Sequence, residues 1–216
     1  MSQYLRVRFY QARRFSFRQE WRFIATLLVL WAAITWNGDW FARLNLPLWN
    51  EASEFPLSDT RSLLVDAQGR IYAGIHYYNR IQVYDASGKY LHGWFVERST
   101  GPFRMRLNEQ GQIEVAIQRT DRVYTYDLAG KLVRNVIQAE AYNQFGSSND
   151  NWHRDALGNV YEVRGGRYFP HITRNNVTII RTKWYLWFIM APFPSILWGV
   201  LAAIVILVSR NVNSQR

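Results

Sequence analysis

Few residues in this chain have the chemistry of a catalytic or metal site. The four histidines lack the HxH or HxxxH spacing of metal ligands, so a metal site would have to be assembled from separate strands. No GxSxG, Walker or dinucleotide-binding motif is present, and the absence of cysteine removes thiolate nucleophiles, cysteine-ligated zinc and disulfides. The histidines are His76, His92, His153 and His171. We therefore predict no catalytic residue, no metal and no cofactor.

Four aspartates resemble a set of paired carboxylates, but their spacing indicates turns. They are Asp66, Asp85, Asp127 and Asp155. Each is followed three residues later by glycine, as in Asp85-Ala-Ser-Gly88. In such a turn the aspartate accepts hydrogen bonds from the backbone ahead of it, and glycine takes the positive φ that ends the turn. Because runs rich in β-branched and aromatic residues flank these turns, such as RIYAGI and RIQVYD, the pattern predicts antiparallel hairpins.

The hairpins belong to an internal repeat. A shift of 42 residues aligns residues 64–89 with 106–131, and nine of these 26 positions are identical. A third unit begins at Asp155-Ala-Leu-Gly-Asn-Val-Tyr161, which matches Asp66-Ala-Gln-Gly-Arg-Ile-Tyr72. Four strands in 42 residues is the period of a β-propeller blade. We predict a mainly β fold with three four-stranded blades at about 62–97, 103–137 and 150–181.

The run IYAGIHYYNRIQVYDASGKYL resembles an NHL repeat. The resemblance is close in the first unit, fair in the second and partial in the third. It implies propeller-type blades, which in that family serve mostly as binding platforms for protein or RNA. This sequence departs from the family pattern where Ile75 and Ile117 replace the usual aspartate. The partners of Arg80 and Arg122 are then open, with Asp85 and Asp127 as candidates.

Three blades fall short of a closed ring, because propellers typically close with about 4–8 blades. An open set of three would expose sheet faces at both ends. Two chains could pair into a six-bladed homodimeric ring, or a partner protein could cap the ends. The sequence leaves these alternatives open.

Two uncharged stretches flank the blades. We predict a transmembrane helix at 23–38, an uncleaved signal anchor with Arg22, Trp36 and Trp40 at the membrane interface. The alternative for this stretch is a cleaved signal peptide, although no small-x-small cleavage site follows it. Residues 184–209 form a second, longer span that begins with an aromatic belt of Trp184, Tyr185 and Trp187. A linker occupies 39–61, the β domain 62–181, and a short tail 210–216.

The charge pattern orients these spans. Residues 1–22 carry six arginines against one glutamate, and this basic arm predicts a cytoplasmic N-terminus. The formal net charge of +10 thus divides into +5 on the arm, +3 on residues 39–183 and +2 on the tail. Attraction to anionic lipid explains the arm, and we predict no nucleic-acid partner. Both termini are expected in the cytoplasm and the β domain in the periplasm, with a bacterial inner membrane as the site.

Blade topology predicts one surface that faces the membrane. In a four-stranded blade the loops between strands two and three emerge on the face where the chain enters and leaves, and the second span begins just after the last strand. We predict binding residues in these loops, suited to lipid headgroups or a neighbouring membrane protein. They are His76, Tyr77, Tyr78, Arg119, Asp121, Arg167 and Tyr168.

The sequence favours a membrane-anchored, extracytoplasmic binding or assembly module rather than a catalyst. Its expected partners are the lipid bilayer and a membrane or extracytoplasmic protein. The alternative is a metal-dependent hydrolase or lyase whose site forms at the central channel of a dimeric six-bladed ring.

Overall fold

A computed structural model describes residues 23–33, 50–97, 101–145, 151–166, 169–190 and 199–207. The chain divides into two compact units. One comprises Met1–Asn37 with Ala191–Arg216, and the other is Gly38–Met190.

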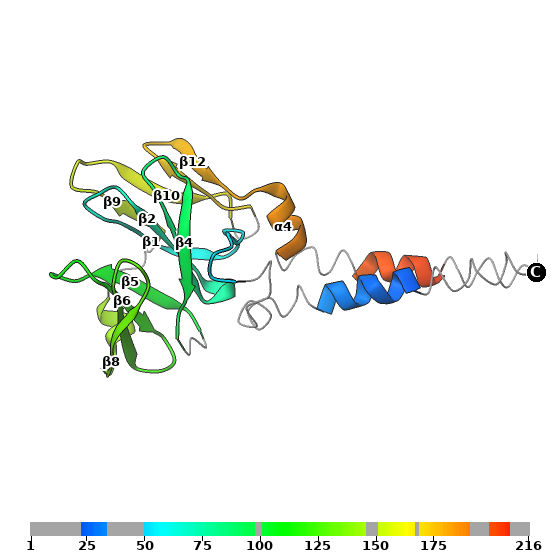
Figure 1. Ribbon diagram of the computed structural model, residues 1–216, viewed down its shortest axis with the longest axis horizontal. Helices are drawn as coiled ribbons and strands as arrows, with labels where there is room; N and C mark the ends of the chain where they lie inside the picture. The colour runs from blue at the N-terminus through cyan, green and yellow to red at the C-terminus, as the bar shows by residue number, and fades with distance from the viewer. Residues whose placement is uncertain are drawn as a thin grey trace, which may run out of the picture. The chain divides into compact units, whose positions relative to one another are not determined.

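The second unit contains three four-stranded antiparallel sheets in consecutive strand order, as predicted (Figure 1). Blade 1 has β1 (Thr60–Val65), β2 (Ile71–Ile75), the 3-10 helix η1 (His76–Tyr78), β3 (Arg80–Tyr84) and β4 (Tyr90–Phe95). Blade 2 has β5 (Phe103–Leu107), β6 (Ile113–Ile117), β7 (Arg122–Tyr126) and β8 (Leu132–Ile137), followed by α3 (Ala141–Gln144). Blade 3 has β9 (Trp152–Arg154), β10 (Val160–Arg164), β11 (His171–Arg174) and β12 (Val177–Arg181), followed by α4 (Trp184–Met190).

The hairpin turns form as the Asp-x-x-Gly spacing predicts. Asp85 Oδ1 accepts hydrogen bonds from the backbone N–H groups of Ser87 (2.8 Å) and Lys89 (3.0 Å). The Ser87 hydroxyl also donates to this carboxylate, at 2.6 Å, and it is the main reason why the pKa of Asp85 lies below its usual value. Asp66, Asp127 and Asp155 accept the same backbone hydrogen bonds in their turns, so the four carboxylates stabilise the turns in which they lie.

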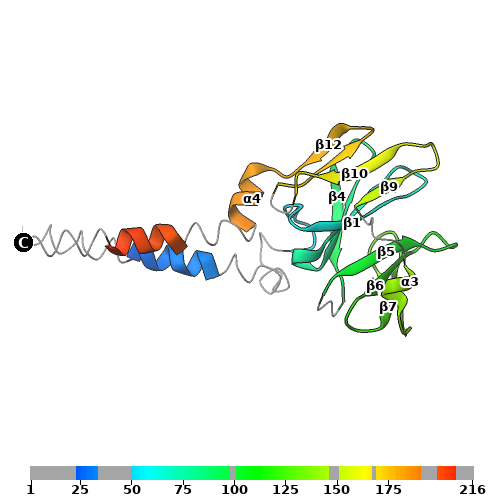
Figure 2. The same cartoon turned by 180° about the vertical axis from the view of Figure 1, so that it is seen from behind.

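Blade 1 lies between blades 2 and 3 (Figures 1 and 2). One face of its sheet, with Ile81 and Trp94, shares a hydrophobic core with Phe103 and Tyr124 of blade 2. On the opposite side, the turn at Gly88 lies against the β12 backbone of blade 3. The innermost strand β1 accordingly packs against both β5 and β9. Blade 1 is thus covered by other blades on both faces.

Arg80, whose partner the sequence left open, bonds to backbone carbonyls and not to a carboxylate. Its side chain is completely buried, and it donates to the backbone carbonyls of Asn50 (3.3 Å), Glu51 (2.6 Å) and Ser53 (2.9 Å). The candidate pairing with Asp85 is wrong, because that carboxylate caps its own turn. Burial lowers the pKa of Arg80. A buried arginine therefore fastens the segment that leads into blade 1.

A short helix covers the face of blade 2 that is turned away from blade 1. Ala141 and Phe145 pack on Ala116 and Val123 of this sheet. The guanidinium of Arg106 lies 4.0 Å from the centre of the Phe145 ring, and that of Arg104 lies 4.3 Å from the Tyr142 ring. The helix thus covers the apolar residues of one of the two sheet faces that an open set of three blades would expose.

The outward face of blade 3 is polar instead. Glu162 and Arg164 form an ion pair there at 2.6 Å, and Thr173 donates to the Glu162 carbonyl. Ile172 and Ile180 of this blade are buried, whereas Trp152 in β9 and Val177 in β12 are 45% and 66% exposed. The two ends of the set of blades thus differ, because a helix lies on one and none of the described helices lies on the other.

The two predicted membrane spans are not shown by the structure. Residues 23–33 and 199–207 are helical, and α4 ends at Met190 within the unit that holds the blades. Residues 34–38, 191–198 and 208–209 of the predicted spans lie outside the described part of the chain. None of the described helices is long and apolar enough to cross a membrane.

Candidate functional site

Loops from two blades meet α4 at one end of the β domain. The hydroxyl of Tyr78, in the β2–β3 connection, donates to the carbonyl of Met190. The ring of Phe169, just before β11, stacks on Trp187 with centroids 4.7 Å apart and planes at 25°. We call residues 76–79, 169–170 and 182–190 the base of the domain. It combines loops of blades 1 and 3 with the segment that leaves blade 3.

The segment that precedes β1 also contacts the base. Lys183 Nζ lies 2.7 Å from Glu54 Oε2, and the backbone N–H of Leu57 donates to Thr182 Oγ1 at 3.1 Å. The hydrogen bond to Glu54 raises the pKa of Lys183. The segments that enter and leave the β domain are therefore held side by side.

Two of the predicted loop residues pack against the fold, with Tyr78 completely buried and His76 half-buried. His76 packs its ring on Phe103 (centroids 4.4 Å apart), and its Nε2 lies 3.4 Å from Ser62 Oγ. Burial lowers the pKa of His76 to about 3, so the ring is neutral at physiological pH. Tyr78 is completely buried, and burial raises its pKa well above the ordinary value. In the described structure both side chains pack within the fold.

The other predicted loop residues are nearer the surface. Tyr77 is half-buried and meets the Tyr78 ring edge-on, with centroids 4.7 Å apart. Arg119 is exposed and its side chain runs past Gly101. Asp121 is exposed with φ of 45°, and its carbonyl accepts the backbone N–H of Gln138 at 2.7 Å. Their role in binding stays a prediction.

Several predicted residues lie outside the described part of the chain. They are the loop residues Arg167 and Tyr168 and the interface residues Arg22, Trp36 and Trp40. Of the predicted belt in α4, Trp184 is 78% exposed and Tyr185 is 43% exposed, whereas Trp187 is half-buried under Phe169. Phe169 itself is 61% exposed. The base therefore presents three exposed aromatic rings.

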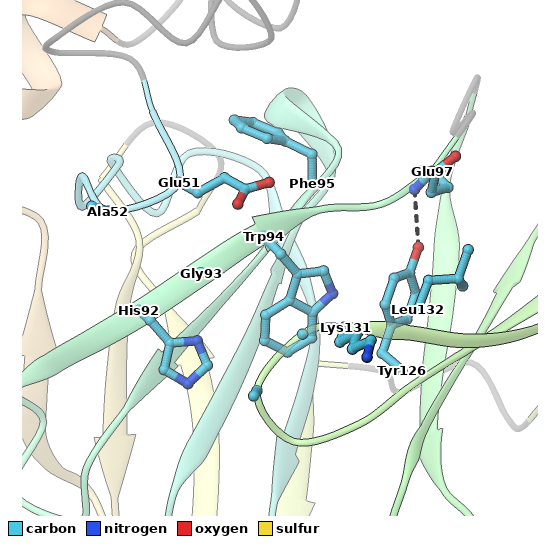
Figure 3. Close-up of a pocket in the computed structure, with 12 residues that line it drawn as sticks. Glu51, Ala52, His92, Gly93, Trp94, Phe95, Glu97, Tyr126, Lys131 and Leu132 are labelled. Carbon is cyan, nitrogen blue, oxygen red and sulfur yellow. Dashed lines mark hydrogen bonds between the residues drawn. The ribbon is translucent and has the colours of Figure 1, made fainter.

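A second candidate site is a cleft of about 580 Å³ at the outer rim, between blades 1 and 2 (Figure 3). We call it the rim cleft. β4 passes through it, the turn between β7 and β8 forms one wall, and the segment at Glu51 forms the other. Its lining residues are Glu51, Ala52, His92, Gly93, Trp94, Phe95, Glu97, Tyr126, Ala129, Gly130, Lys131 and Leu132.

The aromatic residues of the rim cleft are fixed by packing. The rings of His92 and Trp94 are nearly parallel, at 23°, with centroids 5.8 Å apart. The hydroxyl of Tyr126 accepts the backbone N–H of Glu97 at 3.0 Å. A Cβ at Gly130 would lie 2.5 Å from the Trp94 ring, so only glycine lets this turn approach the indole. The cleft has a rigid aromatic wall.

Sequence analysis missed the rim cleft. Its residues come from three segments that share no motif, and their meeting depends on how blade 2 packs on blade 1. The closest sequence signal is the Asp-x-x-Gly turn at Gly130, which predicts a tight turn but not the tryptophan beneath it.

The described residues hold no group of three histidine, aspartate or glutamate side chains that could bind a metal ion. The four histidines lie on different strands or loops, and burial lowers the pKa of His92 and His153 as well as that of His76.

No protein-family model matches the sequence. No curated protein matches it either. Among solved structures, a streptogramin B lyase is 12% identical with a TM-score of 0.35, over 56% of this chain and 39% of that chain. A virginiamycin B lyase from Staphylococcus aureus is 9% identical with a TM-score of 0.34, over 55% and 41%. A protein of unknown function from Bacteroides caccae is 12% identical with a TM-score of 0.31, over 57% and 46%. This chain thus spans less than half the length of these three structures.

Proposed function

We propose that this chain is a membrane-anchored module whose propeller-like β domain lies outside the cytoplasm and binds a partner. The observation that carries the proposal is the base, where Glu54 and Lys183 pair and Leu57 bonds Thr182. These contacts hold together the segments nearest the two long apolar stretches of the sequence. Two spans that emerge from one end of a domain can share one bilayer.

The contacts of α4 support a domain that lies close to the membrane rather than one on a flexible tether. Tyr78 and Phe169 fasten α4 to blades 1 and 3, and the uncharged stretch continues directly beyond Met190. The exposed rings of Trp184, Tyr185 and Phe169 suit the interface between lipid and water, where aromatic side chains are enriched. We infer that the base rests on the bilayer or on a neighbouring membrane protein.

Arginine placement supports the orientation. The N-terminal arm carries six arginines and one glutamate, whereas residues 39–183 carry 18 basic and 15 acidic residues. Positive charge close to a span stays in the cytoplasm, so the arm is cytoplasmic and the β domain is on the other side.

Single-cysteine labelling tests this topology directly, because the chain contains no cysteine of its own. A membrane-impermeant maleimide is applied to intact cells that express either Ala156→Cys, in an exposed blade-3 turn, or Ser214→Cys, in the tail. We expect labelling of Ala156→Cys in intact cells and of Ser214→Cys only after lysis. The reverse pattern would contradict the proposal.

Photocrosslinking tests the role of the base. A photoreactive amino acid at Tyr77 or Trp184 should capture lipid or a membrane protein, and one at Leu157, which is 88% exposed in a blade-3 turn, should capture neither. Equal capture at all three positions would remove the base as a binding surface.

A further inference from the structure

We propose that the rim cleft binds an extended peptide segment that carries a basic side chain, and that this segment pairs with β4 as an added strand. The inference names a ligand class for the binding function proposed above. It requires no particular side of the membrane, because it concerns the outer edge of blade 1.

The first support is the position of β4. Within its sheet the order is β1-β2-β3-β4, so β4 pairs with β3 on one side and ends the sheet on the other. An edge strand presents backbone donors and acceptors to which another strand can be added. In the rim cleft this edge is reached through a groove and is not part of a flat surface.

The second support is the alternation of the lining residues. Successive side chains of a strand point to opposite faces. Figure 3 shows His92 and Trp94 on one side of β4, next to the turn that holds Lys131, and Phe95 on the other side, near Glu51. The side chains on one face of an added strand would therefore contact the wall at Lys131, and those on its other face would contact the wall at Glu51.

The third support is charge. Glu51 and Glu97 are exposed carboxylates of the lining, and Lys131 is its single basic residue apart from the neutral His92. The lining thus carries a net charge of −1 within a domain of +3. Trp94 and Tyr126 are only 4% and 1% exposed, and the Arg80 guanidinium already lies 4.8 Å from the centre of the Phe95 ring, so the two exposed carboxylates are the groups that favour a cation. A lysine or arginine side chain suits these two carboxylates.

A fourth observation is the indole N–H of Trp94. Trp94 is 4% exposed, and its Nε1 has no hydrogen-bond partner. In Figure 3 the ring nitrogen lies on the side of Tyr126 and Leu132, which both line the cleft. A buried donor without an acceptor costs about 1–3 kcal/mol. A peptide carbonyl that displaced the side chains covering this buried nitrogen would supply the acceptor.

Peptide binding to the full chain in lipid nanodiscs tests the proposal, because both faces of a nanodisc are open to solution. The probe is a fluorescein-labelled Thr-Lys-Val-Thr-Lys-Val peptide, measured by anisotropy. One comparison peptide has glutamate in place of lysine, and another is N-methylated on alternate amides, which removes strand pairing but keeps the side chains. We expect the lysine peptide to bind at least about tenfold more tightly than either. Equal binding of the N-methylated peptide would overturn strand addition.

Charge reversal tests the site itself. Glu51→Lys and Glu97→Lys should each weaken the lysine peptide about tenfold. Glu109→Lys, an equally exposed change in the β5–β6 turn outside the cleft, should leave its affinity unchanged. If all three variants bind alike, the rim cleft is not the site.

Disulfide trapping locates the bound peptide. A lysine peptide with one cysteine should cross-link to Ala129→Cys, in the cleft wall, and not to the exposed Ala156→Cys in blade 3. Equal trapping at both positions would contradict the proposal. These outcomes are separate from the topology experiment, since peptide binding in nanodiscs can succeed when the predicted orientation fails, and the reverse also holds.

Discussion

Arg80 Nη2 lies 2.6 Å from the backbone carbonyl of Glu51, so a fully buried guanidinium in blade 1 holds the segment that connects the blades to the chain before them. The same nitrogen also reaches the carbonyl of Ser53 and the hydroxyl of Tyr90. The guanidinium lies 4.5 Å from the centre of the Phe55 ring. The stability of blade 1 and the attachment of this segment are thus linked through one side chain.

Arg80→Met should destabilise the domain by about 3–4 kcal/mol, because it removes a fully buried guanidinium that donates to three backbone carbonyls, of which those of Glu51 and Ser53 keep only the Tyr90 hydroxyl as a side-chain donor. The matched control is Arg122→Met, the same repeat position in blade 2, where Arg122 Nη1 donates to Asn135 at 3.3 Å on the exposed side of the sheet. We expect less than about 1 kcal/mol there. Guanidinium unfolding of the full chain in detergent, followed by near-UV circular dichroism, gives both values. Equal losses would mean that Arg80 has no special role.

Gly130→Ala should be more harmful than Gly111→Ala. Both glycines have positive φ, of 89° and 72°, so each substitution carries a backbone cost of about 1 kcal/mol. A Cβ at Gly130 would also lie 2.5 Å from Trp94, whereas nothing lies within 4 Å of a Cβ at Gly111. We expect Gly130→Ala to cost at least about 1–3 kcal/mol more, as overpacked sites do. Thermal unfolding midpoints test the difference, and similar midpoints would show that blade 2 can move away from Trp94.

Tyr78→Phe should weaken the attachment of α4. The substitution removes the donor for the Met190 carbonyl and should cost about 1 kcal/mol, with faster hydrogen exchange in α4. Tyr124→Phe is the matched control, because the Tyr124 hydroxyl is buried without a hydrogen-bond partner. That change should be neutral or stabilising. Slower or unchanged exchange in α4 of Tyr78→Phe would argue against the contact.

Stability should fall in acid partly because of His76. Burial lowers the pKa of His76 from 6.5 to about 3, and the nearby Arg61 acts in the same direction. The unfolded chain therefore binds a proton first as the pH falls, so the stability present above pH 6.5 declines toward pH 3. The slope from one such group approaches about 1.4 kcal/mol per pH unit. His76→Phe keeps an aromatic ring on Phe103 and should reduce the fall of the unfolding midpoint as the pH is lowered from 6.5 to 4. If the midpoint falls as steeply in the variant as in the parent chain, His76 is not a source of the acid sensitivity.

The local part of the fold could be predicted from the sequence. Asp85 and its counterparts form the predicted turns because an Asx side chain and a glycine three residues later act within a few residues of one another. The three four-stranded sheets follow from those turns and from the strand-like runs between them. The predicted spans depend on residues that the structure describes only in part.

The candidate sites were less predictable because they depend on contacts between distant segments. Sequence reasoning identified the connection at His76–Tyr78 but placed His76 and Tyr78 on a binding surface, whereas Tyr78 is completely buried and the half-buried His76 packs its ring on Phe103. It proposed a carboxylate for Arg80, whereas the partners are backbone carbonyls some 27–30 residues earlier in the chain. Because every residue carries a backbone carbonyl, residue types do not show which carbonyl will accept a hydrogen bond from Arg80.

The amino-acid sequence by itself determined the repeat, the hairpin turns and the mainly β composition of the central region, because each arises from interactions between near neighbours in the chain. Only the tertiary structure decided that blade 1 packs between blades 2 and 3, that α3 covers the free face of blade 2, and that Glu51, Trp94 and Lys131 line one cleft. These contacts depend on how the surfaces of complete sheets fit together. The two surfaces in each contact come from segments that are far apart in the chain, so no local sequence pattern predicts them.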